Sequence, residues 1–148
     1  MTELPKRRYP VHLPNIERHN QAVILFVTAC TNPRRAVLDN DRMHDLLRES
    51  WAVAEQSVVG RYMIMPDHLH LFCSPRDRAS EGVKRWVGYW KRLVSRETPD
   101  LQPLWLRDCW DTQLRDSGHY TEKWSYVSMN PVRKGLVASP GIGRFRAR

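Results

Sequence analysis

Two histidines separated by one leucine, His68 and His70, are the first residues of this sequence that could do chemistry. They belong to an apolar run typical of a strand, where side chains two positions apart point to the same face. Two imidazoles on one face can bind a single divalent cation. Asp67 precedes the pair and could orient a histidine, or could simply form a turn. A chance HxH pattern on a solvated strand face remains open as well.

A second candidate pair, Tyr126 and Asn130, lies four residues apart near the C-terminal end. Residues at this spacing share one side of a helix. A tyrosine hydroxyl is a potential nucleophile, and an asparagine amide is a potential metal ligand. Tyr120, Trp124 and Val127 form a different stripe, which should face the core, so Tyr126 and Asn130 are expected to point away from its centre. For an isolated tyrosine, a place at the boundary of an amphipathic helix is the simpler interpretation.

Basic residues gather on one predicted helix and form the third candidate. They are Lys84, Arg85, Lys91, Arg92 and Arg96. Such side chains hold phosphates, and neighbouring aromatic rings can stack unpaired bases. The interleaved tryptophans, Trp86 and Trp90, fall on the apolar stripe of this helix, so core packing is their expected role. The basic set is a candidate DNA-binding surface, although many helices carry a cationic face towards solvent.

The elements that must position these residues follow a simple order. Strands are predicted at 22–31, 57–65, 68–74 and 104–114, and helices at 40–56, 80–96 and 120–129. Asn40 and Asp41 are the capping candidates for the first helix, and Ser80 is expected to cap the second. Ser117-Gly118 is expected to form a turn. This order predicts an α+β fold. A ferredoxin-like antiparallel sheet would carry helices on one face, and an extra C-terminal helix would carry Tyr126.

Size and charge narrow the class of protein. A chain of 148 residues fits one domain spanning 1–148, with a basic arm at 1–20 and a frayed tail at 139–148. The net charge of +8 favours a polyanion such as nucleic acid as partner.

Cysteine spacing and hydropathy address the compartment. Cys30, Cys73 and Cys109 form no CxxC pair, which argues against a disulfide framework or a zinc ribbon and favours a reducing cytoplasm. The longest apolar run, 22–30, is far shorter than the roughly 20 residues of a membrane-spanning helix. A polar, proline-containing stretch precedes it, so it does not resemble a signal peptide, and no membrane association is expected.

Longer motifs surround the histidines and the tyrosine. Residues 62–72 read YMIMPDHLHLF and residues 126–137 read YVSMNPVRKGLV. With LFVTACT at 25–31 and WDTQLRDSGHYTEKW at 110–124, they make residues 18–137 similar to the REP-associated tyrosine transposases. These are relatives of the IS200-like single-strand transposases of the HUH nuclease superfamily. The final residues, 141–148, depart from the tryptophan-containing ending expected of the family.

The resemblance implies a function and assigns roles. His68 and His70 would bind the metal, Mg²⁺ or Mn²⁺, with Asn130 at the position of a third polar ligand, and Tyr126 would be the nucleophile. Relatives cut single-stranded DNA near hairpins, form a 5′-phosphotyrosine link and release a 3′-hydroxyl. The resemblance therefore predicts a DNA-nicking and rejoining transposase whose partner is single-stranded or hairpin DNA. Such an enzyme would be cytoplasmic and associated with the nucleoid when bound to DNA.

Two other interpretations remain open at this point. One is a non-catalytic, domesticated regulator that binds palindromic repeats through the same fold. The other is an unrelated metal hydrolase built on the two histidines, whose activity would survive loss of Tyr126. The sequence also leaves open whether the chain acts as a monomer or as a homodimer.

Overall fold

The computed structural model describes residues 23–76, 82–114 and 116–129. Four strands in these ranges form one antiparallel sheet in the order β2-β3-β1-β4. The strands are β1 (Leu25–Cys30), β2 (Ser57–Ile64), β3 (His68–Pro75) and β4 (Trp110–Gln113). A strand–helix–strand–strand–helix–strand order within one antiparallel sheet is the ferredoxin-like arrangement. The predicted fold class is therefore confirmed.

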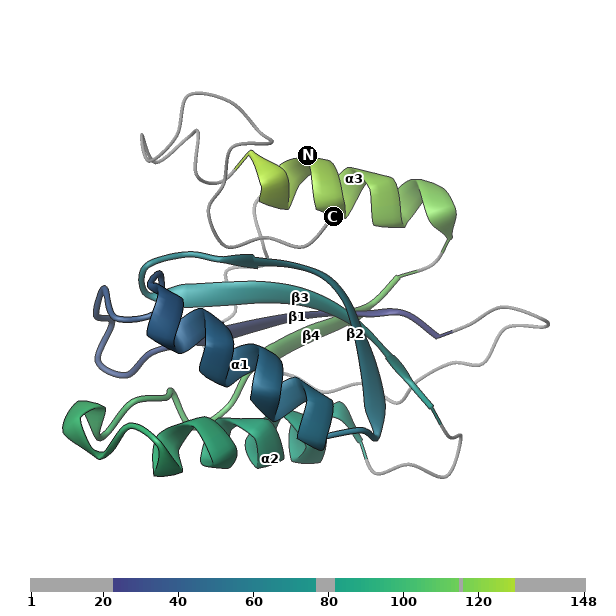
Figure 1. The fold of residues 1–148 in the computed structure, drawn as a ribbon. Coiled ribbons are helices and arrows are strands. Elements are labelled where there is room, and N and C mark those ends of the chain that lie inside the picture. The colour runs from purple at the N-terminus through teal and green to yellow at the C-terminus, as the bar shows by residue number, and fades with distance from the viewer. Residues whose placement is uncertain (1–22, 77–81, 115, 130–148) are drawn as a thin grey trace.

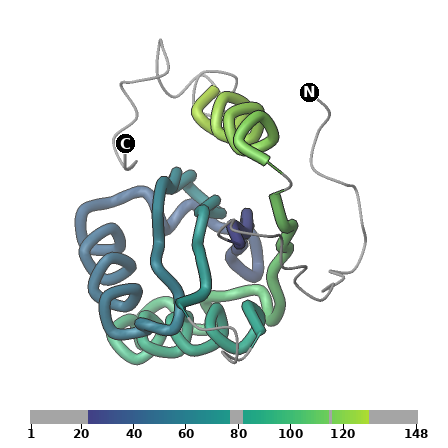
Figure 2. Tube along the Cα trace, turned by 90° about the vertical axis from the view of Figure 1, so that its right-hand side faces the viewer, coloured from purple at the N-terminus to yellow at the C-terminus, as the bar shows by residue number. Residues whose placement is uncertain are grey.

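The helices lie on the two faces of this sheet (Figures 1 and 2). α1 (Asp41–Val53) and α2 (Val83–Arg96) cover one face, and a short 3-10 turn, η1 (Pro99–Leu101), follows α2. α3 (Ser117–Ser128) covers the opposite face. The two crossover helices thus share one face as predicted, and the additional helix closes the other. None of the helices described is long and apolar enough to span a membrane.

The main hydrophobic core lies between the sheet and the α1/α2 layer. Leu69 and Leu71 of β3 point into it and are fully buried. Trp51 of α1 and Trp90 of α2 meet edge to face, with ring centroids 6.0 Å apart. Fully burying a side chain of leucine size stabilises a protein by about 1.5–3 kcal/mol. Apolar burial therefore fixes α1 and α2 to this face.

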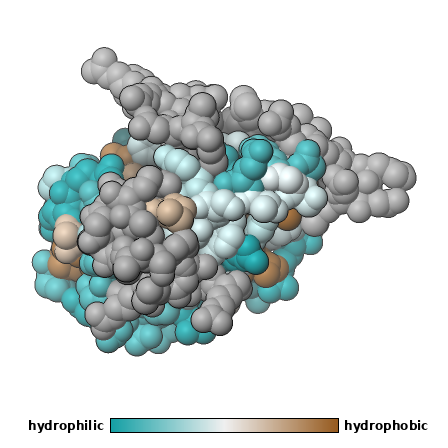
Figure 3. All heavy atoms as spheres, turned by 90° about the horizontal axis from the view of Figure 1, so that it is seen from above, coloured by the Kyte–Doolittle hydropathy of each residue, from teal (hydrophilic) through white to brown (hydrophobic). Residues whose placement is uncertain are grey.

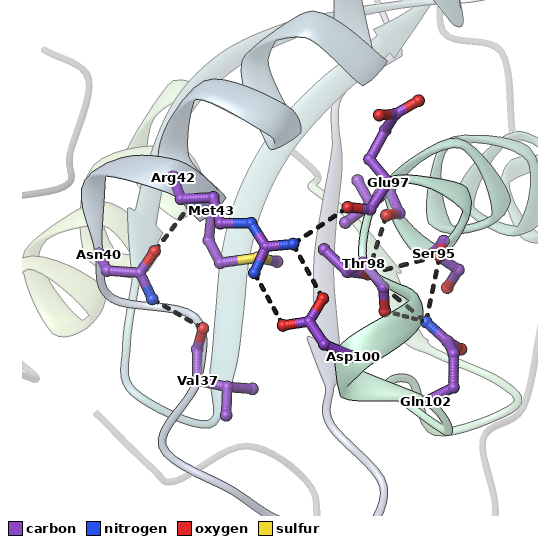
Figure 4. Close-up of polar contacts among 10 residues, drawn as sticks. Val37, Asn40, Arg42, Met43, Ser95, Glu97, Thr98, Asp100 and Gln102 are labelled. Atoms are coloured by element: carbon purple, nitrogen blue, oxygen red, sulfur yellow. Dashed lines mark hydrogen bonds and ion pairs between the residues drawn. The ribbon is translucent and has the colours of Figure 1, made fainter.

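Polar contacts also join the start of α1 to the segment after α2 (Figure 4). The N-cap residue of α1, Asn40, accepts a hydrogen bond from the backbone N–H of Met43 at 2.9 Å. Arg42 donates to both carboxylate oxygens of Asp100, at 2.9 and 3.0 Å, and to the carbonyl of Glu97 at 3.1 Å. Exposed ion pairs contribute about 0–1 kcal/mol each. These contacts therefore align the two helices more than they stabilise them.

The predicted last strand is much shorter than expected. β4 spans only Trp110–Gln113, and the stretch before it is irregular apart from one bridge between Thr31 and Trp105. Lys91 of α2 donates hydrogen bonds to the carbonyls of Leu106 and Asp108, at 2.9 Å each. A lysine side chain therefore satisfies two backbone carbonyl groups of this stretch, a tertiary contact that sequence periodicity could not reveal.

Two predicted helix starts also need correction. Ser117 and Gly118 form the first turn of α3 rather than a separate turn, because Asp116 caps the helix by accepting from the N–H of His119 at 2.8 Å. α2 begins at Val83 after Gly82, without a side-chain cap. The expected cap, Ser80, lies outside the described residues.

Candidate metal-binding and nucleophile site

Strand β3 brings the two predicted metal ligands together. His68 and His70 point to the face covered by α3, with ring centroids 4.9 Å apart and nearly perpendicular planes. Leu69 and Leu71 point to the α1/α2 face instead. The histidines are only 7% and 2% exposed, so they lie beneath other side chains rather than on an open polar strand face. Their burial argues against the alternative that His68 and His70 are a chance HxH pattern on a solvated strand face.

His70 is fixed by two neighbours on β1. Its Nδ1 lies 2.8 Å from the hydroxyl of Thr28, its cross-strand partner. Its ring stacks on Phe26, with centroids 5.3 Å apart and an interplanar angle of 16°. If Thr28 accepts the proton of Nδ1, the lone pair of Nε2 becomes the ligating one. Partners of this kind set the tautomer and orientation of metal-bound histidines.

His68 is held by the turn between β2 and β3. Its Nδ1 lies 2.8 Å from Oδ1 of Asp67, and the Arg34 guanidinium donates to the other carboxylate oxygen at 3.0 Å. Arg34 also comes within 3.4 Å of the same histidine nitrogen. The shorter contact, to a carboxylate, assigns the proton to Nδ1. Asp67 thus takes the orienting position that the sequence left open.

The carboxyl group of Asp67 remains ionised well into acid. Partial burial raises its pKa, but the hydrogen bonds from Arg34 and His68 outweigh burial and hold the pKa at about 2. A permanent negative charge beside Nδ1 of His68 makes this imidazole a more basic ligand at its other nitrogen.

The helix that carries Tyr126 rests on the same face as the histidines. Phe72 of β3 packs against Tyr120 and Trp124, with centroid distances of 4.4 and 6.0 Å. The Arg61 guanidinium of β2 lies over the Trp124 ring at 5.1 Å. Tyr120 and Trp124 therefore face the sheet, as the stripe predicted. Val127 completes the contact and is fully buried.

Tyr126 lies at the edge of this contact. It is half-buried and packs against the cluster formed by Phe26, Met63, Phe72 and neighbouring side chains. The Tyr126 ring therefore lies closer to the sheet than the helical stripe predicted. The predicted third ligand, Asn130, lies outside the described residues.

The donor set of this face fits a divalent cation. Two neighbouring imidazoles, each with a hydrogen-bonded Nδ1, offer nitrogen ligands with the support that metal sites use. No group of three or more His, Cys, Asp and Glu side chains that could hold a metal occurs among the described residues. A third protein ligand would therefore be of another residue type or come from outside these ranges. A phosphate oxygen can occupy a coordination position of a divalent cation that the protein leaves open.

The basic residues of α2 lie on the other side of the sheet. Lys84, Arg85, Arg92 and Arg96 are exposed. Side chains of α2 and of the 107–109 segment line an open groove of about 320 Å³, in which Lys84 reaches Asp108 at 3.6 Å. The structure does not bring these residues together with His68 and His70. Lys91 differs from the other four, since it is 6% exposed and both of its hydrogen bonds go to backbone carbonyls.

Three residues of the site were missed from the sequence. Thr28 and Arg34 support the two histidines, and Lys123 of α3 is 9% exposed with its ammonium 5.3 Å from the Phe26 ring centroid. A signal for Lys123 existed, because it falls three residues after Tyr120, within the stripe that faces the core. Thr28 also carried a signal, as one of two hydroxyl residues in the otherwise apolar stretch 22–31.

Comparisons with known proteins support the fold. No family model and no curated protein matches this sequence. Among solved structures, it is similar to a REP-associated tyrosine transposase bound to a REP hairpin, with a TM-score of 0.72 at 17% identity over 90% of this chain and 82% of that one. A candidate transposase from Deinococcus radiodurans R1 gives a TM-score of 0.50 at 18% identity over 86% and 100%. The predicted resemblance is therefore confirmed at the level of the fold.

Proposed function

We propose that this protein is a metal-dependent DNA-nicking and rejoining enzyme that acts on single-stranded or hairpin DNA through Tyr126. The observation that carries this proposal is the juxtaposition of a supported histidine pair and a tyrosine-bearing helix on one face of the sheet. The same fold in a transposase bound to a REP hairpin supports DNA as the substrate. The net charge of +8 agrees with a polyanionic partner.

The chemistry follows from the residue types. A divalent ion such as Mg²⁺ or Mn²⁺, held by His68 and His70 with Asn130 as the expected third ligand, would neutralise and polarise the scissile phosphate. The Tyr126 oxygen attacks the phosphorus and loses its proton, while the bond from phosphorus to the 3′ oxygen breaks and that oxygen takes up a proton. The products are a 5′-phosphotyrosine and a free 3′-hydroxyl. A second 3′-hydroxyl can reverse the step and restore the tyrosine without ATP.

Contacts around the histidines and along α3 support a site whose geometry is fixed before DNA binds. Thr28 and Asp67 keep the imidazoles oriented before substrate arrives. The aromatic contacts of Tyr120 and Trp124 hold α3 against the sheet within the same chain. Seen from the α3 side, the described surface is mostly hydrophilic or neutral, with a few apolar patches (Figure 3). Such a surface suits a charged nucleic acid better than an apolar partner.

The test is covalent capture of DNA. The full chain is incubated with Mn²⁺ and a hairpin oligonucleotide carrying a single-stranded flank, and the protein is analysed on a denaturing gel and by mass spectrometry. We expect an adduct on Tyr126, which Tyr126→Phe abolishes while hairpin binding persists. The matched control is Tyr120→Phe, on the same helix but packed against Phe72, which should retain the adduct.

Each other outcome is informative. An adduct that persists in Tyr126→Phe, or that maps to another tyrosine, would refute the assignment of the nucleophile. Hairpin binding without any adduct in the unaltered protein would favour the non-catalytic regulator instead. Cleavage without a covalent intermediate, independent of Tyr126, would favour the metal hydrolase.

A further inference from the structure

Lys123 is a buried cation that the chemistry above does not use. It lies on α3, three residues before Tyr126, and residues at this spacing are neighbours on a helix. Only 9% of the residue is exposed. Its ammonium lies 5.3 Å from the centroid of the Phe26 ring, the ring on which His70 stacks. One aromatic side chain therefore joins the lysine to the histidine pair.

This ammonium has no anionic partner in the part of the chain that the structure describes. Among residues 23–76, 82–114 and 116–129, Lys123 forms no hydrogen bond or ion pair, and its ammonium contacts the Phe26 ring. Burial accordingly lowers its pKa from the ordinary lysine value. Burying a charge without a partner is costly, and an anion brought to it would recover part of that cost.

A second buried lysine provides a contrast within the same molecule. Lys91 is 6% exposed, but its ammonium donates to the carbonyls of Leu106 and Asp108 and lies over the Trp105 ring. These bonds give Lys91 a structural role, since they hold the segment before β4 against α2. Lys123 has no comparable bonds to the described residues, so the described contacts do not explain why its ammonium is buried.

We infer that Lys123 receives a non-bridging oxygen of a DNA phosphodiester, at the face that carries His68, His70 and Tyr126. This inference rests on the proposed function and deepens it. As a catalytic residue, Lys123 would neutralise negative charge that develops on the attacked phosphate. Its place one helical turn from Tyr126 fits contact with the scissile phosphate or with the adjacent one.

The experiment compares three variants of the full chain. Lys123→Met keeps an unbranched side chain of similar length and removes the charge. Lys123→Arg keeps the charge, and Lys91→Met is the control for a structural lysine. Each protein is measured for unfolding in denaturant, for hairpin affinity across a salt series, and for the single-turnover rate of adduct formation at saturating DNA.

We expect Lys123→Met to unfold at the same or a higher denaturant concentration, whereas Lys91→Met unfolds earlier. The salt slope of binding should fall by about 0.7, the contribution of one phosphate contact on a single strand. The adduct rate should fall at least tenfold, and Lys123→Arg should restore part of it. A flank with a single neutral methylphosphonate should identify the phosphate, because at that position Lys123→Met has no further effect on affinity.

Other results would overturn the inference. Unchanged salt slope and adduct rate in Lys123→Met would do so while leaving the proposed function intact. Destabilisation as large as that of Lys91→Met would assign Lys123 a structural role instead. If the unaltered protein forms no adduct, the proposed function fails, and the salt slope and methylphosphonate series still decide whether Lys123 contacts a phosphate.

Discussion

The two faces of this sheet are built from the same strands but have different contents. On the α1/α2 face, Leu69 and Leu71 pack with tryptophans in an apolar layer. On the α3 face, the alternate positions of the same strand, His68 and His70, lie beside a threonine, a buried lysine and a second aromatic cluster. Alternation along β3 therefore separates a face that stabilises the fold from a face that carries the candidate site.

The difference also concerns how the helices are held. α1 and α2 attach through many fully buried aliphatic and indole side chains. α3 attaches mainly through half-buried aromatic rings and cation–π contacts, with Val127 as its one fully buried apolar side chain among the described residues. Buried polar groups near α3 need specific partners, and they lose more when a partner is removed. We therefore expect substitutions on the α1/α2 face to alter stability first, and substitutions on the α3 face to alter function first.

The largest effect should come from removing both histidines. Alanine would leave cavities here, because both rings are buried, so His68→Leu with His70→Leu is the better change. We expect calorimetry to detect no specific Mn²⁺ binding and covalent capture to yield no adduct. Loss of the Thr28 partner should cost about 1–3 kcal/mol of unfolding free energy.

The matched control for this prediction lies on the opposite face of the same strand. Leu71→Met conserves volume in the α1/α2 core and should cost less than about 1.5 kcal/mol. It should leave Mn²⁺ affinity unchanged. Retained Mn²⁺ affinity in the double histidine variant would contradict the metal site and remove the functional distinction between the faces.

A pair of tryptophans tests the difference in stability. Trp90→Ala removes a fully buried ring from the α1/α2 core and should lower the free energy of unfolding by about 3–5 kcal/mol. Trp124→Ala removes a half-buried ring that contacts Phe72 and Arg61, and should cost only about 1–2 kcal/mol. Guanidinium unfolding measures both changes.

The two tryptophan variants should rank in the opposite order when the rate of adduct formation is measured. Measured at low temperature and corrected for the folded fraction, it should fall more in Trp124→Ala than in Trp90→Ala, because only the former loosens the helix that carries Tyr126. Equal stability losses, or a greater loss of rate in Trp90→Ala, would mean that the two faces do not divide stability and function in this way.

Sequence periodicity predicted the fold and the residues of the candidate site that lie within one strand or one helix. Alternation placed His68 and His70 on one face, and the stripe of α3 identified Tyr120, Trp124 and Val127 as sheet-facing. These patterns are local, since they depend on spacing within one element.

The supporting residues could not be predicted in this way. Thr28 and Arg34 reach the histidines from positions 42 and 34 residues away along the chain. Such pairings depend on strand register, which spacing within one element does not define. The shortened β4 is a similar case, because the bonds of Lys91 to that segment are tertiary.

The smallest effect should come from the basic surface of α2. Arg85→Gln with Arg92→Gln removes two exposed charges that line the groove beside residues 107–109, on the face opposite the histidines. If DNA reaches this surface, hairpin affinity at about 150 mM salt should fall a few-fold and the salt slope by roughly one to two, because exposed phosphate contacts act mainly through counterion release. The adduct rate at saturating DNA should stay unchanged, since these residues lie away from Tyr126. Arg48→Gln, an exposed change on α1, is the control and should leave the slope as it is. An unaltered slope in the double variant would exclude Arg85 and Arg92 from the DNA interface and confine binding to the rest of the molecule.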